Sequence, residues 1–97
     1  MKYSVKYPNS NCQKRVEKEL LQMPAEIRER TLLELENLSV CPRPFGIQKI
    51  KPPLAVGSVV AQYRIRIGSW RLLYDIDEGH KTIWIITLRR RNEDTYK

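Results

Sequence analysis

Apolar and polar residues alternate at the very start of the chain. Residues 3–7 read Tyr-Ser-Val-Lys-Tyr, which predicts a short strand with one buried face. Residues 8–11, Pro-Asn-Ser-Asn, break this pattern and can cap a helix. From Asn11 to Gln22 the spacing becomes helical, because Val16 and Leu20 lie four positions apart among charged residues.

A second helix is expected directly after the first. Pro24 interrupts the first helical pattern and can occupy the first turn of a new helix, which runs to about Leu38. Because the link between the two helices is so short, we expect them to form an antiparallel hairpin. The apolar stripe of the second helix consists of Ile27, Thr31, Leu35 and Leu38, widened by Leu32.

The remainder of the chain predicts strands separated by turns. Pro52 and Pro53 should end the first of these strands. Gly68-Ser69 is typical of a two-residue hairpin turn between the second and third. The last strand is an unbroken apolar run, which indicates burial on both faces. The predicted strands are Gln48–Lys51, Val59–Ile67, Trp70–Ile76 and Thr82–Leu88.

These elements predict the fold class. Ninety-seven residues allow one domain, covering positions 1–97. The order is a strand, two helices and then three or four strands in a meander. That order is typical of an α+β fold, in which the helices pack on one face of a mostly antiparallel sheet.

The Gly68-Ser69 turn also predicts which side chains share a face of the hairpin. With a two-residue turn, Ile67 faces Trp70 and Arg66 faces Arg71. Arg64, Arg66 and Arg71 then share one face. The opposite, core face holds Tyr63, Ile65, Ile67, Trp70, Leu72, Tyr74 and Ile76.

Two arginines directly opposite each other repel and destabilise a strand pair. A solvated basic face is the ordinary explanation for a single arginine. For three clustered arginines, an anion-binding site is the better interpretation, because guanidinium groups bind phosphate bidentately. A basic tail with a tyrosine follows, Arg89-Arg90-Arg91 and then Tyr96, and each of these taken alone could be a solvated or packing residue.

Net charge supports an anionic partner. The chain carries a formal charge of +7. Residues 1–45 hold eight basic and six acidic side chains (8 − 6 = +2), and residues 46–97 hold ten and five (10 − 5 = +5). Nucleic acid, an acidic protein or an anionic membrane surface would each suit this balance, and the C-terminal half is where an anion should bind.

Other classes of function receive little support from the sequence. Cys12 and Cys41 fit no metal-binding spacing and are expected to be reduced thiols, and the only histidine, His80, lies in a predicted turn. We therefore expect neither a metal site nor a cofactor. No apolar run is long enough to span a bilayer, and the N-terminus does not resemble a signal peptide, so a cytoplasmic location is expected.

Several motifs resemble the RelE/ParE superfamily of toxins from type II toxin–antitoxin systems. They are the opening strand, Leu-Gln-Met-Pro between the helices, Pro-x-Pro-x-Gly at 42–46 and the Gln-Lys-Ile strand at 48–50. The most specific are the segment Tyr63–Tyr74 and the closing Arg-Arg-x-x-x-x-Tyr-Lys. The resemblance covers nearly the whole chain and implies the microbial RNase-like fold of that superfamily.

The resemblance implies two alternative activities. RelE-type members are endoribonucleases that cut mRNA in the ribosomal A site, using the RNA 2′-hydroxyl as nucleophile and no metal. ParE-type members inhibit DNA gyrase and usually lack the closing tyrosine, so Tyr96 favours the RelE branch. Partners implied are an acidic antitoxin, in a hetero-oligomeric complex, and mRNA with the ribosome (16S rRNA near the A site).

The resemblance also implies roles for individual residues. Arg71, Arg91 and Tyr96 would be catalytic, with Arg90 as an alternative to Arg91 because the spacing to the tyrosine varies. Tyr96 would act as the base, since this chain has arginines where some RelE-like toxins have lysines, and arginine practically never gives up its proton. The expected RNA-binding residues are Arg64, Arg66, Arg90, Lys49 and Lys51.

Overall fold

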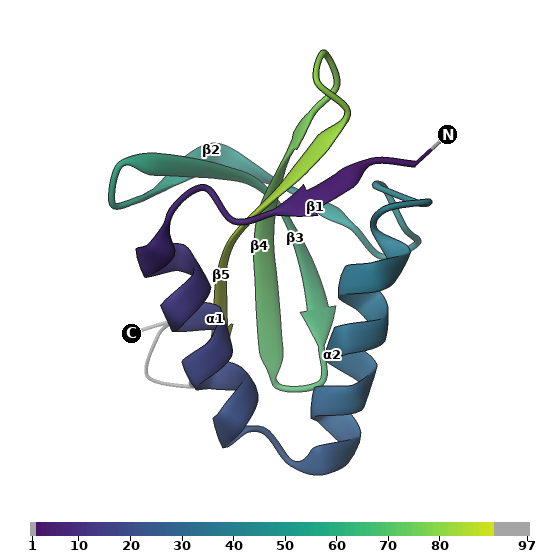
Figure 1. The fold of residues 1–97 in the computed structure, drawn as a ribbon, viewed down its shortest axis with the longest axis vertical. Coiled ribbons are helices and arrows are strands. Elements are labelled where there is room, and N and C mark those ends of the chain that lie inside the picture. The colour runs from purple at the N-terminus through teal and green to yellow at the C-terminus, as the bar shows by residue number, and fades with distance from the viewer. Residues whose placement is uncertain (1, 91–97) are drawn as a thin grey trace.

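A computed structural model describes residues 2–90 of the chain. A five-stranded sheet and two helices make up this part (Figure 1). None of the described helices is long and apolar enough to cross a membrane. The elements are β1 (Ser4–Lys6), α1 (Ser10–Gln22), α2 (Ala25–Asn37), β2 (Gln48–Val56), β3 (Val59–Ile67), β4 (Trp70–Asp77) and β5 (Thr82–Arg90).

The sheet confirms the predicted α+β class. Its strand order is β1-β5-β4-β3-β2, so the meander from β2 to β5 is antiparallel and only β1 pairs in parallel, beside β5. The β3–β4 hairpin has the predicted register, from Ile67 opposite Trp70 to Tyr63 opposite Tyr74. Its turn has a positive φ of 58° at Gly68, a conformation that glycine adopts without steric cost.

Both helices form where the sequence places them. The Asn9 side chain caps α1 by accepting a hydrogen bond of 2.9 Å from the backbone N–H of Cys12. Arg28 of α2 donates to the carbonyls of Leu20 and Met23, at 2.8 and 3.0 Å, and so ties the end of α1 to the start of α2. The helices run antiparallel as predicted, but they spread apart, so each one packs on the sheet (Figure 1).

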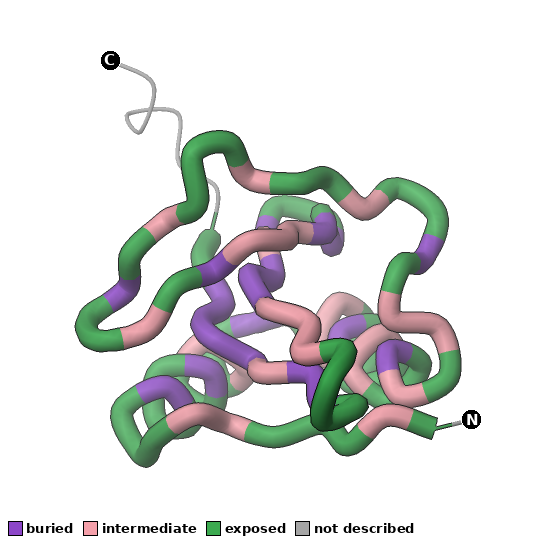
Figure 2. Tube along the Cα trace, turned by 90° about the horizontal axis from the view of Figure 1, so that it is seen from above, coloured by how far each residue is buried: buried purple, intermediate pink, exposed green. Residues whose placement is uncertain are grey.

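The main core lies between the helices and one face of the sheet. Figure 2 shows the buried segments gathered in the middle of the molecule. The predicted core face of the hairpin is confirmed, because its residues are buried or pack against this cluster. The fully buried members include Val16, Leu38, Ile67, Leu72, Tyr74, Ile83, Ile85 and Leu88.

The prediction that Leu32 and Val5 are buried is wrong. Leu32 of α2 is 46% exposed. The packed stripe of this helix is centred on the buried Thr31, whose hydroxyl donates a hydrogen bond of 2.8 Å to the Ile27 carbonyl, and Leu32 lies to one side of that stripe. Val5 of β1 is 36% exposed, although Tyr3 and Tyr7 pack against the core. A hollow between β1 and α2 leaves Val5 uncovered.

The prediction that Pro52 and Pro53 end a strand is also wrong. β2 continues through both prolines to Val56. It tolerates them because it is an edge strand whose pairing with β3 shifts between Lys49 and Leu54, so neither proline has to donate to a regular ladder.

A second, smaller cluster fills the face of the sheet opposite the helices. Its buried members are Val56, Ala61, Leu73 and Ile86. Leu73 lies on the same face as the hairpin arginines, so this face is only partly polar. No periodic pattern in the sequence indicates this cluster, because its members come from four different strands.

A bulge in β5 sets which residues of that strand face which side. Leu73 pairs with Thr87, whereas the next residue, Tyr74, pairs with Ile85, so Ile86 is an extra residue. Beyond the bulge, the side chains of β5 alternate between the two faces of the sheet in the opposite phase. Leu88 therefore joins the main core, and Arg89 lies on the opposite face.

We expect Leu72→Ala to lower the free energy of unfolding by about 2–5 kcal/mol, because Leu72 is fully buried and its loss leaves a cavity. Urea unfolding measures this change. Leu33→Ala makes the same deletion at a residue 65% exposed and should change stability by less than about 0.5 kcal/mol. Equal losses in both variants would contradict the described core.

Candidate functional site

Three arginines lie side by side across three neighbouring strands. Arg66 of β3 pairs with Arg71 of β4, and Arg71 pairs with Arg89 of β5. Paired residues point to the same face, and neighbouring strands lie about 4.8 Å apart. We call Arg66, Arg71 and Arg89 the arginine row. It lies on the sheet face opposite the helices.

The row is accessible at its two ends. Arg66 and Arg89 are exposed, and Arg71 between them is half-buried. Arg64 shares the face, and its Nε donates a hydrogen bond of 2.9 Å to Oε1 of Gln48, its paired residue on β2. Gln48, which the sequence analysis did not single out, therefore holds the Arg64 guanidinium over the sheet.

Arg90, a predicted RNA-binding residue, lies on the other face. It pairs with Trp70, and its guanidinium carbon is 5.3 Å from the centre of the Trp70 ring, a cation–π contact. The Trp70 indole donates to Glu19 of α1 at 3.1 Å. The sheet therefore separates Arg90 from the row. Arg89, which sequence reasoning left out of the site, takes the place beside Arg71.

The two predicted lysines lie on the edge strand β2, and both are exposed. Lys49 pairs with Tyr63, so it belongs to the helix-facing side of the strand. Lys51 lies within the stretch where β2 shifts its register against β3. Neither lysine is in register with the arginine row. Arg91 and Tyr96 lie outside the described residues.

Ionisable groups elsewhere have structural roles. Glu78 accepts hydrogen bonds from Tyr3 (2.7 Å) and Arg43 (2.6 Å). The bond from Tyr3, followed by the bond from Arg43, lowers the pKa of the Glu78 carboxyl below its usual value. Burial raises the pKa of the Tyr74 phenol, whose hydroxyl donates to the Pro42 carbonyl at 2.9 Å. Tyr74 is therefore unsuited to be a base.

His80 lies in the β4–β5 turn, as predicted. Its backbone N–H and its ring both form hydrogen bonds with the Asp77 carboxylate. These bonds, with the backbone bond as the larger cause, lower the pKa of the Asp77 carboxyl. Within residues 2–90, no three His, Cys, Asp or Glu side chains come together as a metal-binding group. Cys12 and Cys41 are free thiols.

The arginine row has the chemistry of an anion-binding surface. Guanidinium groups in adjacent strands present several N–H donors to one side of the sheet and remain charged at all relevant pH values. An anion between them would relieve their mutual repulsion. The geometry suits a phosphate, or a phosphodiester that acquires additional charge during reaction.

A family model described as the ParE toxin of the type II toxin–antitoxin system parDE matches residues 12–95. The chain belongs to this toxin family. It is therefore a type II toxin of the RelE/ParE superfamily, as its motifs predict. No curated protein matches the chain.

Solved structures support the same assignment. The toxin resembles a chain of the archaeal RelE–RelB complex from Pyrococcus horikoshii OT3, with 28% identity, coverage of 96% of this chain and 99% of that one, and a TM-score of 0.71. Two further structures share the fold. One is the toxin–antitoxin complex RelBE2 from Mycobacterium tuberculosis, with 24% identity, coverage of 94% of this chain and 100% of that one, and a TM-score of 0.63. The other is a double-arginine mutant of Escherichia coli toxin RelE in the free state, with 17% identity, coverage of 99% of this chain and 90% of that one, and a TM-score of 0.56.

The arginine row predicts opposite effects for two adjacent substitutions in this toxin. Arg89→Gln removes like-charge repulsion and should leave stability equal or raise it by up to about 1 kcal/mol. Arg90→Gln removes the contact with Trp70 and should cost about 0.5–1 kcal/mol.

Urea unfolding at low and high salt tests this pair of variants. The difference in the free energy of unfolding between wild type and Arg89→Gln should decrease at high salt, because salt screens the repulsion between the arginines. A loss of stability in Arg89→Gln that matches the loss in Arg90→Gln would contradict the described register.

Proposed function

We propose that this toxin is a ribosome-dependent endoribonuclease, which cleaves mRNA in the A site and so inhibits translation. The observation that carries the proposal is the arginine row of Arg66, Arg71 and Arg89 on the sheet face opposite the helices. Three guanidinium groups on one sheet face attract an anion and can bind it bidentately. The phosphodiester backbone of RNA is such an anion.

The proposed reaction uses the RNA's own 2′-hydroxyl. Its oxygen attacks the adjacent phosphorus, the bond from phosphorus to the 5′-oxygen breaks, and the leaving oxygen takes up a proton from water. The products are a 2′,3′-cyclic phosphate and a 5′-hydroxyl. Tyr96 would accept the proton of the 2′-hydroxyl, and Arg91 would neutralise the leaving oxygen.

The described residues would hold the reacting phosphate. Arg64 and Arg66 would bind the backbone around it, and Arg71, at the centre of the row, would stabilise the charge of the pentavalent transition state. Arg89 is added because it flanks Arg71 on the same face. Lys49 and Lys51 would make outer contacts to RNA from the edge strand.

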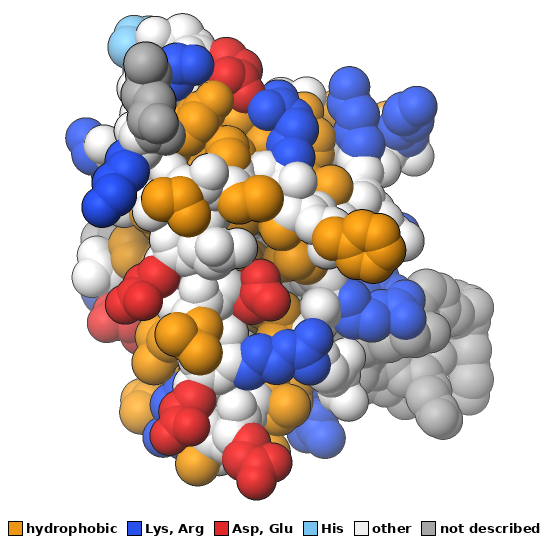
Figure 3. Space-filling model, turned by 90° about the vertical axis from the view of Figure 1, so that its right-hand side faces the viewer, with side chains coloured by type: hydrophobic (Ala, Val, Ile, Leu, Met, Phe, Trp, Pro, Cys, Tyr) orange, Lys and Arg blue, Asp and Glu red, His pale blue; other side chains and the backbone are white. Residues whose placement is uncertain are grey.

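We further propose a cognate antitoxin as the protein partner. The structures from Pyrococcus horikoshii and Mycobacterium tuberculosis are toxin–antitoxin complexes. A net charge of +7 favours an acidic partner. Hydrophobic side chains lie among charged ones on the side formed by α2 (Figure 3), and Leu21, Leu32 and Leu33 of the helices are exposed. The antitoxin would cover this surface and the arginine row, in the cytoplasm where the ribosomes are.

Inhibition of DNA gyrase without RNA cleavage is the second candidate function. The observation in its favour is the matching family model, which is described by the ParE toxin. This function requires a protein-binding surface and no reacting group. It therefore assigns no chemical role to Arg71 or Tyr96.

Two parallel assays separate the candidates. Primer extension on an mRNA in a translating extract should show discrete cuts within ribosome-occupied codons when the toxin is added. Gyrase supercoiling should be unaffected by the same protein. Inhibited supercoiling with uncut mRNA would overturn the endoribonuclease proposal in favour of the ParE-type activity.

Substitutions in the row should separate catalysis from folding. Arg71→Ala and Arg89→Ala should each reduce cleavage, Arg71→Ala by about a hundred- to a thousandfold, and Arg71→Ala should abolish growth inhibition. Arg90→Ala is the matched control on the opposite face and should remain toxic. Growth inhibition at equal expression and cut yield in the extract measure both effects. Full toxicity of Arg71→Ala would show that the row is not the site.

Tyr96→Phe tests the proposed base, because it removes only the phenol oxygen. Single-turnover cleavage on the ribosome should slow by about a hundred- to ten-thousandfold. A 2′-deoxy nucleotide at the cut site should stop the wild-type reaction. Wild-type rates with Tyr96→Phe would exclude the tyrosine as base, and products carrying a 5′-phosphate would overturn the whole mechanism.

A further inference from the structure

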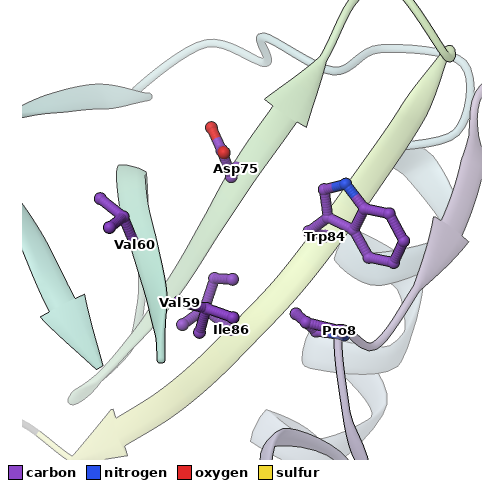
Figure 4. Close-up of a pocket in the computed structure, with 6 residues that line it drawn as sticks. All are labelled: Pro8, Val59, Val60, Asp75, Trp84 and Ile86. Atoms are coloured by element: carbon purple, nitrogen blue, oxygen red, sulfur yellow. The ribbon is translucent and has the colours of Figure 1, made fainter. Parts of the chain in front are cut away.

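A hollow of about 330 Å³ opens on the same side of the sheet as the arginine row. Its lining comes from β3, β4, β5 and Pro8, which follows β1. In Figure 4, Trp84 and Pro8 lie on one side of it and Val60 on the other, with the helices behind the sheet. The volume falls within the range of small-ligand sites, about 300–1,000 Å³. The lining residues are Pro8, Val59, Val60, Asp75, Trp84 and Ile86.

Two of these residues have no part in the proposed cleavage chemistry, although they face the substrate side. Asp75 pairs with Trp84 across β4 and β5, and both are only half-buried. A half-exposed indole gives a flat surface on which a nucleobase can stack. A carboxylate beside it accepts hydrogen bonds only, so it selects groups that donate them. An exocyclic amino group projects from the edge of a base, whereas the N3–H of uracil lies between two carbonyl oxygens that repel a carboxylate.

The carboxylate of Asp75 is held in one orientation. Its Oδ1 accepts hydrogen bonds from Nε2 of Gln62 (3.1 Å) and from the backbone N–H of Ile76 (2.9 Å). Both bonds end on the same oxygen, which leaves Oδ2 to accept from a ligand. Gln62 therefore positions the acceptor in the hollow.

The hollow and the row lie at opposite ends of one strand face. Arg71, Leu73 and Asp75 alternate along the same face of β4, so Asp75 is four residues, about 13 Å, from the row. A short single strand of RNA could place a phosphate at the arginines and a nearby base in the hollow. The negative charge of Asp75 repels phosphate, so it favours the base end of a nucleotide there.

We propose that this hollow is a base-binding site that biases where the toxin cuts, accepting a base with an exocyclic amino group in preference to uracil. Trp84 stacks on the base and Oδ2 of Asp75 accepts a hydrogen bond from its amino group. The inference rests on the proposed endoribonuclease function, and it assigns Asp75 and Trp84 to specificity, with no part in the chemical step.

The test compares cut sites of the full-length toxin and its variants by primer extension in a translating extract. Wild-type cuts should show a preference for amino-bearing bases over uracil, at a fixed position near the cut, on the order of tenfold. Asp75→Asn replaces an acceptor by a donor and should abolish or invert this preference. Trp84→Leu should weaken cleavage about ten- to a hundredfold for all bases, and Trp84→Phe should restore most of it.

Asp77→Asn is the matched control. It makes the same change two residues further along β4, where the carboxylate bonds to His80 in the turn, and the base preference should remain that of the wild type. Two-dimensional NMR gives an independent readout. Short amino-bearing RNA oligonucleotides should shift the Trp84 indole and the Gln62 side-chain amide, while the buried Trp70 indole stays in place.

The outcomes are distinguishable. A wild-type toxin that leaves mRNA uncut would overturn the proposed function, and the inference with it. Wild-type cutting, with the same base distribution in Asp75→Asn and an unmoved Trp84 indole, would overturn the base site alone. A Trp84 indole that moves with an acidic antitoxin peptide and never with RNA would make the hollow a protein contact, which also overturns it.

Discussion

The candidate site depends on one extra residue in β5. If β5 paired with β4 without the bulge at Ile86, the register seen at Tyr74 and Ile85 would continue to the strand end. Arg89 would then lie opposite Trp70 on the helix side, and the apolar Leu88 would lie opposite Arg71. The bulge reverses the alternation at little cost, because one residue is left out of the ladder. It completes the main core with Leu88 and places a third guanidinium beside Arg71.

The two faces of the sheet have different structural roles. The helix side buries a continuous apolar cluster and supplies most of the stability, since burial of apolar surface is the dominant favourable term in folding. The opposite side has only a small cluster around Leu73. It can therefore hold charged residues in register at one end and a half-buried indole and carboxylate at the other. The opposing arginines can be accommodated on this side because the other face is well packed.

The anchoring hydrogen bonds of the fold are separate from the arginine row. Carboxylates and phenols with perturbed pKa values, Glu78, Asp77 and Tyr74, tie the β4–β5 turn, β1 and the loop after α2 together. The contacts of Asp77 and Glu78 lie at the end of β4 away from the arginine row, and Tyr74 lies on the opposite face of the sheet. This toxin can thus expose its basic surface without weakening the hydrogen bonds that hold these segments in place.

The sequence alone determined the local features, because these depend on neighbours along the chain. Alternation with period two and a two-residue Gly-Ser turn were enough to pair Arg66 with Arg71 and to assign the core face of the hairpin. Helical spacing and capping residues located both helices. The motifs around Tyr63–Tyr74 were enough to indicate the toxin superfamily, which the family model confirms.

Only the tertiary structure decided the features that depend on contacts between distant segments. The edge position of β2 let a strand run through Pro52 and Pro53. Packing of Ile85 and Leu88 on the helices required the bulge, which placed Arg89 instead of Leu88 opposite Arg71 and put Arg90 on the helix side. The convergence of four strands around Leu73 and the hollow beside Trp84 left no periodic signal, because each strand contributes only one or two residues to them.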